Sequence, residues 1–282
     1  MKLVSVNTGL PREVSWHPPS SELRRAGPPT RAGPFGKLRA GGRIVTTAIF
    51  KEPVAGRVAL RKLNLDGDRQ ADLRVHGGEH KAVYCYPLAH YGYWKKEFIA
   101  QKTRDGAEVP GRELPMGMFG ENFTIEGNAE GSAEGNADAG KDALLGGQAL
   151  PGGQGLLEDS IHLGDRFSIG TAEVVVTQPR LPCYKLGIRF GSDDMVKRFL
   201  ASGRTGFYVA VAREGEVGAG DEIKLIAREA NAVPVSEITR LYVVKRYGEA
   251  EIRAVQRALG VKELPESWKE YFRERLRQAG SL

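Results

Sequence analysis

Apolar and polar residues alternate over short runs through most of the chain, and turn signals such as Asp66-Gly67 and Gly218–Asp221 separate many of these runs. Period-two alternation between turns is the pattern of half-buried β-strands. Regularly spaced short strands are typical of a barrel or a sandwich. The predicted strands are Lys2–Val6, Ile44–Phe50, Arg57–Leu65, Asn122–Ile125, Arg166–Ile169, Glu173–Thr177, Gly206–Ala212 and Glu222–Ala227.

The pattern becomes helical after Val233. The last predicted helix carries an apolar stripe at helical spacing from Trp268 to Leu276, which favours packing against the rest of the protein. We therefore predict a mainly β protein with helices, in which a barrel-like domain spans residues 1–233 and a small helical subdomain spans residues 234–282. The predicted helices are His90–Lys102, Asp193–Ser202, Ser236–Tyr247, Ala250–Leu259 and Pro265–Gln278.

Two segments, residues 18–42 and 127–155, interrupt the β pattern. The first contains repeated Pro, Gly and Arg, and the second is rich in Gly and Ala and lacks aromatic residues. Neither segment can bury enough apolar surface to offset the entropy lost on ordering. We predict that both are flexible surface insertions.

The net charge of +6 raises the question of nucleic-acid binding. Six basic residues and one acid lie between Pro18 and Arg43, so most of the excess charge belongs to one segment and no nucleic-acid partner is expected. The sequence contains no apolar run near the length of a membrane helix, and the first residues lack a signal-peptide pattern. We therefore expect a cytoplasmic protein without a membrane partner.

Cys183 is the strongest candidate for chemistry among the two cysteines. It follows a predicted buried strand, in the loop Gln178–Lys185, where two prolines restrict the backbone on either side of Arg180. Nearby positive charge favours the thiolate, which is the form that attacks electrophiles and binds soft metals. Cys85 lies within an apolar run and fits a buried core residue instead.

Four other residues are candidates for binding a ligand, and His76, Lys81 and Arg204 among them, with Arg180, suit an anionic group. His76 and Lys81 flank the Gly77-Gly78 turn, and a loop of this composition suits a phosphate. Arg204 lies between glycines in Gly203–Gly206 and can offer a carboxylate or phosphate two N–H groups. Asn122 follows a Gly turn and offers amide donors and an acceptor.

These motifs, in this order, resemble the MOSC domain family and, within it, the YiiM-like proteins. The resemblance covers nearly the whole chain apart from the two insertions, and residues 235–282 look like the three-helix appendix of the YiiM-like branch. The most specific match is the Cys183 segment. The matching pieces are Asp66–Asp68, Val75–Gly78, Lys81–Val83, Tyr86-Pro87, Phe119–Asn122, His162–Asp165, Thr177–Leu186, Gly203–Gly206 and Gly220-Asp221.

The resemblance implies a distorted β-barrel and a molybdenum cofactor (molybdopterin) whose metal is bound by Cys183. It also implies reduction of N-hydroxylated compounds such as base analogues and hydroxylamines. We expect His76, Lys81, Asn122, Arg180 and Arg204 to help bind the cofactor. The sequence contains no dinucleotide-binding fingerprint, so the electrons are expected from a separate reductase.

Three alternatives remain open at this point. Cys183 can carry sulfur as a persulfide, in which case the protein is a sulfur or cofactor carrier. The protein can also be a ligand-binding or stress-sensing module without turnover. A cysteine hydrolase is the third alternative, and it requires a base such as His76 or His80 beside Cys183.

Overall fold

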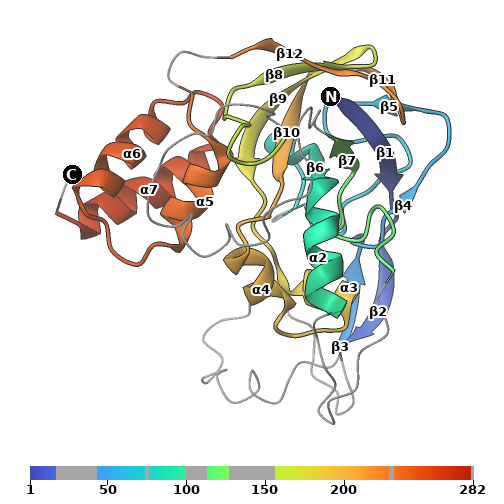
Figure 1. Cartoon of the computed structure of the whole chain (residues 1–282), viewed down its shortest axis with the longest axis horizontal. Helices are drawn as coiled ribbons and strands as arrows, with labels where there is room; N and C mark the ends of the chain where they lie inside the picture. The colour runs from blue at the N-terminus through green and yellow to red at the C-terminus, as the bar shows by residue number, and fades with distance from the viewer. Residues whose placement is uncertain (17–42, 74–75, 100–112, 127–155, 229–231, 281–282) are drawn as a thin grey trace.

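The structure is a computed structural model that describes residues 1–16, 43–73, 76–99, 113–126, 156–228 and 232–280 (Figure 1). Both predicted insertions lie outside the described residues. The strands are β1 (Lys2–Thr8), β2 (Arg12–Trp16), β3 (Arg43–Thr47), β4 (Glu52–Pro53), β5 (Arg57–Leu60), β6 (Val83–Pro87), β7 (Phe123–Glu126), β8 (Arg166–Ile169), β9 (Ala172–Pro179), β10 (Phe207–Arg213), β11 (Gly215–Gly218) and β12 (Ile223–Ala227).

The helices fall into two groups. A 3-10 turn and three α-helices lie between strands in the sequence, and three more follow the last strand. None of the described helices has both the length and the apolar character needed to cross a membrane. The helices are η1 (Glu79–Lys81), α2 (Ala89–Ile99), α3 (Tyr184–Phe190), α4 (Met195–Ala201), α5 (Val235–Val243), α6 (Glu249–Leu259) and α7 (Glu266–Gln278).

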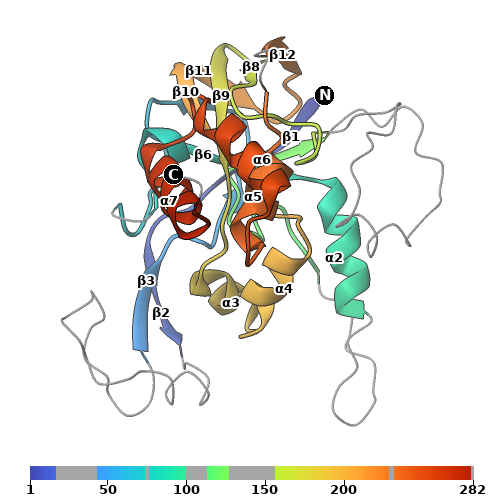
Figure 2. The same cartoon turned by 90° about the vertical axis from the view of Figure 1, so that its left-hand side faces the viewer.

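The main sheet has eight strands in the order β12-β8-β9-β10-β6-β7-β1-β4. Its neighbours are antiparallel except for β6 and β7, which are parallel and are connected through α2. Two smaller sheets pair β2 with β3 and β5 with β11. Figures 1 and 2 place α5, α6 and α7 beside the sheet, and α3 and α4 at the end away from β12.

The sheet is not closed into a barrel, so this part of the expected fold is wrong. Lys2 and Glu222 form an isolated bridge, and the Leu3 amide donates to the Asp221 carbonyl at 2.9 Å. These contacts bring the start of β1 to the turn before β12, but β12 itself pairs with β8 along Ile223–Ala227. A mainly β fold with additional helices is confirmed, as an open sheet whose far ends approach each other.

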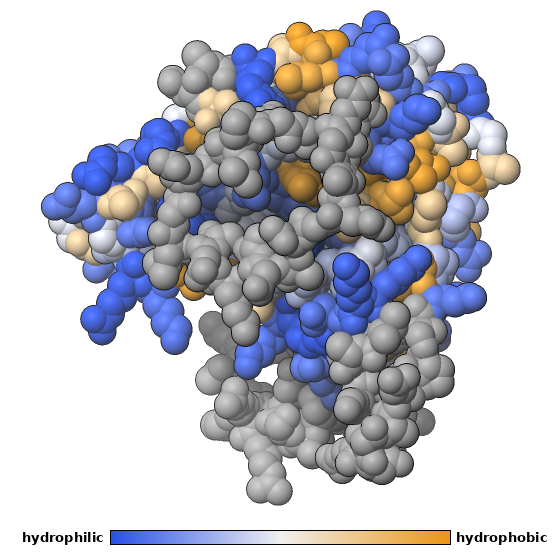
Figure 3. Space-filling view, viewed as in Figure 1, coloured by the Kyte–Doolittle hydropathy of each residue, from blue (hydrophilic) through white to orange (hydrophobic). Residues whose placement is uncertain are grey.

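The C-terminal helices share an apolar core with the sheet. One cluster of buried side chains includes Val176 and Val209 of the sheet and Leu241, Val255 and Phe272 of the helices. The predicted stripe on α7 is confirmed, since its buried residues are Trp268, Phe272 and Leu276. The face of the C-terminal helices that Figure 3 shows is mostly hydrophilic. The division into domains at residues 233 and 234 stays a prediction.

A second buried cluster, rich in aromatic rings, lies under α2, α3 and α4. The Tyr86 and Phe119 ring centroids are 4.5 Å apart, and Trp94 stacks on Phe199 at 5.7 Å. The Trp94 indole N–H donates to the Tyr86 hydroxyl at 2.8 Å. Large rings have few rotatable bonds, so this cluster forms a rigid base beneath the segments that follow β6 and β9 and the segment that precedes β7.

The two glycines of Gly203–Gly206 provide a matched test of this packing. Both have φ of 67°, where an alanine costs about 1–2 kcal/mol. A Cβ at Gly206 would lie 2.4 Å from the Cys85 carbonyl oxygen, whereas a Cβ at Gly203 would have no atom within 4 Å. We expect Gly206→Ala to lower the free energy of unfolding by more than about 3 kcal/mol. Gly203→Ala should lower it only by the backbone cost of about 1–2 kcal/mol. Equal losses in denaturant unfolding would contradict this packing.

Candidate functional site

Two cavities meet at Cys183. The outer cavity has a volume of about 610 Å³ and lies between the Cys183 loop and helices α5 and α7. The inner cavity has a volume of about 100 Å³ and extends toward β3 and the Phe119–Asn122 segment. The residues that line both cavities form the boundary between them. These residues are His76, Lys81, Leu181, Cys183, Lys185 and Tyr208.

Cys183 is the last residue before α3, and its backbone is extended, with φ of −123°. The loop is fixed to the neighbouring strand because the Arg180 amide donates to the Gly206 carbonyl at 3.2 Å. The thiol is half-buried, and its Sγ lies 3.5 Å from His76 Nε2. Among the described residues, no group of three or more His, Cys, Asp or Glu side chains is arranged to hold a metal ion.

His76 is an uncharged imidazole at neutral pH. Burial has the largest effect, followed by the positive charges of Lys185, Lys81 and Arg180, and together they lower the pKa of His76 to about 4. Its Nδ1 is buried and has no hydrogen-bond partner. The ring therefore sits against the sulfur as a neutral group with one polar atom unsatisfied.

Arg180 places a buried positive charge beside the inner cavity. The guanidinium carbon lies 5.0 Å from the ring centroids of both Tyr84 and Phe199, and Nη2 donates to the Phe119 carbonyl at 3.4 Å. Its Nη1 is buried without a partner. Buried polar atoms are nearly always satisfied in proteins, so an orphan donor on a cation indicates a place for an anionic ligand.

The two lysines of the boundary add to this charge. Lys185, on the first turn of α3, is 9% exposed and lines both cavities. Lys81, at the end of η1, is half-buried, and burial lowers its pKa. Together with Arg180 they surround Cys183 with cationic groups from two separate segments of the chain.

Asn122 lines the inner cavity, but its amide is already engaged with the protein. Its Oδ1 accepts from the Tyr84 amide at 3.2 Å, and its Nδ2 donates to Asp68 Oδ2 at 3.0 Å. Asp68 in turn forms a buried ion pair with Lys51. The structure therefore gives Asn122 a role in joining β6 to the Asp68 turn.

Arg204 does not join the group around Cys183. Its Nη1 donates to the Ser202 carbonyl at 3.2 Å, and its guanidinium lies over the Tyr93 ring at 4.1 Å. It is absent from the lining of both cavities. His80 is also outside them, with an exposed side chain, so His76 is the histidine beside Cys183.

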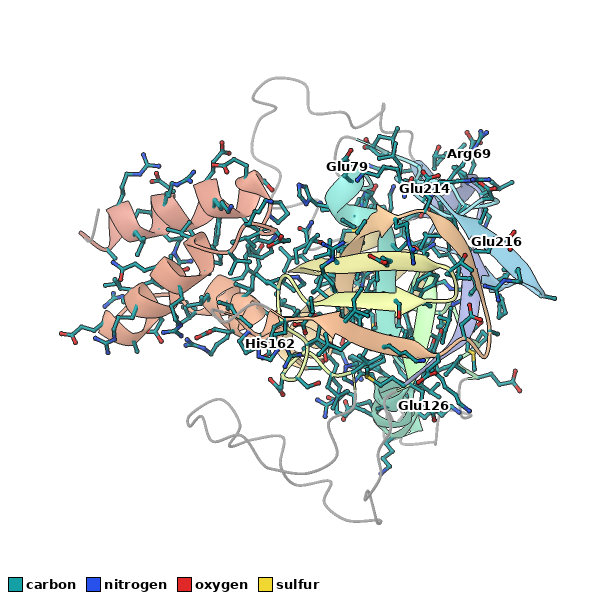
Figure 4. All side chains as sticks on the ribbon, turned by 90° about the horizontal axis from the view of Figure 1, so that it is seen from above. Arg69, Glu79, Glu126, His162, Glu214 and Glu216 are labelled. Atoms are coloured by element: carbon teal, nitrogen blue, oxygen red, sulfur yellow. The ribbon has the colours of Figure 1, made fainter. Side chains whose placement is uncertain are left out.

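The sequence indicated Lys185 only as a positive charge near Cys183, and it did not indicate the aromatic residues of α5 and α7 as site residues. Tyr242, Trp268 and Tyr271 line the outer cavity. The Trp268 indole donates to Gln178 Oε1 at 2.8 Å, which ties α7 to the end of β9. In Figure 4, Glu79 of η1 lies at the end of the sheet that faces the helices, while Arg69, which lines the inner cavity, lies farther away.

Comparisons with known proteins agree with these motifs. The chain is 34% identical over 236 residues to the uncharacterized protein YflK of Bacillus subtilis, covering 83% of this chain and 87% of YflK. It is 29% identical over 240 residues to protein YiiM of Escherichia coli, covering 85% and 89% of the two chains. A protein named reductase from Gibberella moniliformis is 27% identical over 229 residues, which are 80% of this chain and 34% of that protein.

The crystal structure of YiiM from Geobacillus stearothermophilus has a TM-score of 0.61 and 28% identity, and the match covers 98% of both chains. The YiiM-like, 3-alpha helix domain matches residues 233–279, which include α5, α6 and α7. The MOSC domain matches residues 72–145 and 153–224, which include His76, Lys81, Arg180 and Cys183. The chain therefore belongs to the MOSC domain family, with a YiiM-like three-helix domain after the MOSC domain.

Proposed function

We propose that this protein is a molybdenum-cofactor-dependent reductase of N-hydroxylated compounds. One observation carries the proposal. The half-buried thiol of Cys183 lies at the boundary of two cavities, beside a buried arginine whose Nη1 has no partner. A soft metal ligand next to a buried guanidinium with an unpartnered N–H donor matches a cofactor that combines a thiophilic metal with a phosphate.

The residues present fit this cofactor. Cys183 would bind the metal, since a thiolate is a soft ligand and carries charge that the neighbouring cations stabilise. Arg180, Lys81 and Lys185 would hold the phosphate, and the Arg180 donor that lacks a protein partner would gain one. His76 would remain neutral and pack against the sulfur. When bound, the cofactor supplies two-electron chemistry that amino-acid side chains lack.

The reaction breaks one N–O bond. An N-hydroxylated substrate, R–NH–OH, takes up two electrons and two protons and gives the amine R–NH₂ and water. The electrons come from a separate reductase, and the protons come from water that enters through the outer cavity. Lys185 lines that cavity and can donate a hydrogen bond to the departing hydroxyl group, which lowers the cost of placing charge on its oxygen.

Membership of the MOSC family supports a molybdenum cofactor in general terms, and the reductase from Gibberella moniliformis supports redox chemistry by its name. The runner-up function is a sulfur carrier, in which Cys183 holds a persulfide. The accessible thiol favours it as well. Metal and pterin analysis of protein made in a host that synthesises molybdopterin separates the two, because a carrier would contain labile sulfur without molybdenum.

The anion site predicts a specific response to inorganic phosphate. Excess phosphate should raise the melting temperature of the wild-type protein, because a ligand that binds only the folded state stabilises it. In Arg180→Met this shift should be lost. Arg204→Met is the matched control, since Arg204 lies outside both cavities, and it should keep the shift. Equal shifts in all three proteins, measured by thermal unfolding, would remove Arg180 from the site.

The two cysteines should differ in function. Cys183→Ser should keep the fold but lose molybdenum and the reduction of hydroxylaminopurine, because a serine hydroxyl is a hard group that stays protonated. Cys85→Ser should keep turnover but lose about 1–3 kcal/mol of stability, because the new hydroxyl would be buried in the apolar core. Burial also raises the pKa of the Cys85 thiol.

Molybdenum content, turnover and denaturant unfolding of both variants check this contrast. Wild-type turnover by the cofactor-loaded Cys183→Ser protein would exclude Cys183 from the reaction. Loss of turnover in a folded Cys85→Ser protein would show that the assignment of the two cysteines is reversed.

A further inference from the structure

Strand β9 has one residue more than β10 has opposite it, just before the loop that carries the thiol. Val176 pairs with Val209 and Gln178 pairs with Tyr208, so Thr177 is the extra residue. Successive side chains of a regular strand point to opposite faces of the sheet. An extra residue of this kind is a β-bulge, which interrupts the alternation and redirects side chains. The bulge therefore allows two consecutive side chains of β9 to reach the same neighbour.

That neighbour is the carbonyl oxygen of His80, in the middle of η1. The Thr177 hydroxyl donates to this oxygen at 2.7 Å, and Gln178 Nε2 donates to it at 3.1 Å. A carbonyl oxygen has two lone pairs, so it can accept both hydrogen bonds. The next residue, Lys81, ends η1 and lines both cavities. The bulge thus attaches the turn that carries Lys81 to the strand that leads to Cys183.

Helix α7 fixes the orientation of the Gln178 amide. The Trp268 indole N–H donates to Gln178 Oε1 at 2.8 Å, and an indole N–H can only donate. The His80 carbonyl, on the other side of the amide, can only accept. One orientation of the amide satisfies both neighbours, with its oxygen toward the indole and its nitrogen toward η1. Loss of the indole N–H would allow the amide to turn over and place its oxygen against the His80 carbonyl.

The position of η1 depends strongly on these hydrogen bonds. Gly77 and Gly78 precede it with φ of 91° and 83°, a region that glycine adopts far more readily than other residues. None of the residues of η1 is buried, and the side chains of Glu79 and His80 are exposed. Burial therefore contributes little to fixing the turn, and the contacts from β9 have a correspondingly larger effect on where Lys81 lies.

We propose that Gln178 and Trp268 are positioning residues for Lys81. Through them, helix α7 keeps an ammonium group beside Cys183 and maintains the positive field around its thiol. An ammonium group that moves away from the sulfur loses much of this effect, because the Coulomb energy falls with distance and water screens it. The proposal concerns the surroundings of the thiol, so it does not depend on the reaction that Cys183 serves.

The test compares the alkylation of Cys183 by anionic iodoacetate and by neutral iodoacetamide. In both reactions the thiolate sulfur displaces iodide from a CH₂ group. The ratio of the two rate constants at one pH therefore cancels the thiolate fraction and measures the electrostatic field at the sulfur. The full-length protein is made in a host without molybdopterin, so that no metal competes for the thiol, and mass spectrometry identifies the modified cysteine.

The wild-type ratio of iodoacetate to iodoacetamide rates should exceed that of N-acetylcysteine, a free thiol. Lys81→Met removes one charge and should lower the ratio on the order of tenfold. Trp268→Phe keeps an aromatic ring without the N–H and should lower it about threefold, and Gln178→Met should lower it at least as much. Tyr247→Phe is the matched control. It removes the hydrogen bond from Tyr247 to the Leu241 carbonyl within the C-terminal helices, outside both cavities, and should keep the wild-type ratio.

A double-mutant cycle separates positioning from a general loss of structure. If Trp268 acts through Lys81, Trp268→Phe should not lower the ratio further in a Lys81→Met protein. A further threefold drop in that background would overturn the proposal. Circular dichroism establishes that each variant is folded. Should Trp268→Phe fail to fold, Gln178→Met takes its place in the same cycle.

Three other results would also contradict the proposal. They are a wild-type ratio no higher than that of N-acetylcysteine, an unchanged ratio in Lys81→Met, and an unchanged ratio in both Trp268→Phe and Gln178→Met. The proposed function is tested separately, by the molybdenum content of wild-type protein from a host that makes molybdopterin. Absence of molybdenum there would contradict the proposed function and leave the alkylation result as it is.

Discussion

Burial of the Arg180 guanidinium is the constraint on which the site depends. A charge removed from water is costly unless its environment compensates it. Here the compensation comes from the π-faces of Tyr84 and Phe199 and from the Phe119 carbonyl. These groups leave Nη1 without a hydrogen-bond partner, so the described residues satisfy the hydrogen-bonding capacity of the guanidinium only in part.

The Phe119–Asn122 segment helps to stabilise the buried Arg180 guanidinium, because it supplies the Phe119 carbonyl that accepts a hydrogen bond from Nη2. Glu121 is buried and accepts hydrogen bonds from the Gly117 amide at 2.8 Å and the Phe119 amide at 3.0 Å, which sets the shape of the turn. The adjoining Asn122 connects that turn to the Tyr84 amide and to Asp68. Residues that read as separate motifs in the sequence therefore form one support, which orients the Phe119 carbonyl toward Arg180.

Local patterns predicted much of the fold. The strand at Arg166–Ile169 has the predicted bounds, and the three C-terminal helices and the α7 stripe lie where helical spacing placed them. Helix α3 was missed because Tyr184–Phe190 is short and contains a glycine, so its periodicity is weak. Closure of a barrel depends on how distant strands meet, and no local pattern records that β12 pairs with β8.

The sequence also predicted part of the candidate site. Proline spacing and charge singled out Cys183 and Arg180, and the structure brings His76, Lys81 and Asn122 to the same pair of cavities. Arg204 was also predicted to bind the cofactor, but its guanidinium lies over the Tyr93 ring instead. The flanking glycines do not determine the direction of the Arg204 side chain, so the sequence could not predict this contact. The sequence predicted only a packing role for Trp268. Its hydrogen bond to Gln178 joins residues 90 positions apart, and no local sequence pattern indicates such a contact.

The C-terminal helices change the surroundings of the Cys183 thiol. Without Tyr242, Ser267, Trp268 and Tyr271, one wall of the outer cavity would be missing and the Cys183 loop would face open solvent. Enclosure lowers the local dielectric constant and strengthens the interaction of Lys81 and Lys185 with an anionic or polar ligand. The sheet therefore supplies the reactive and charged groups, and the helices supply the enclosure that makes those charges effective.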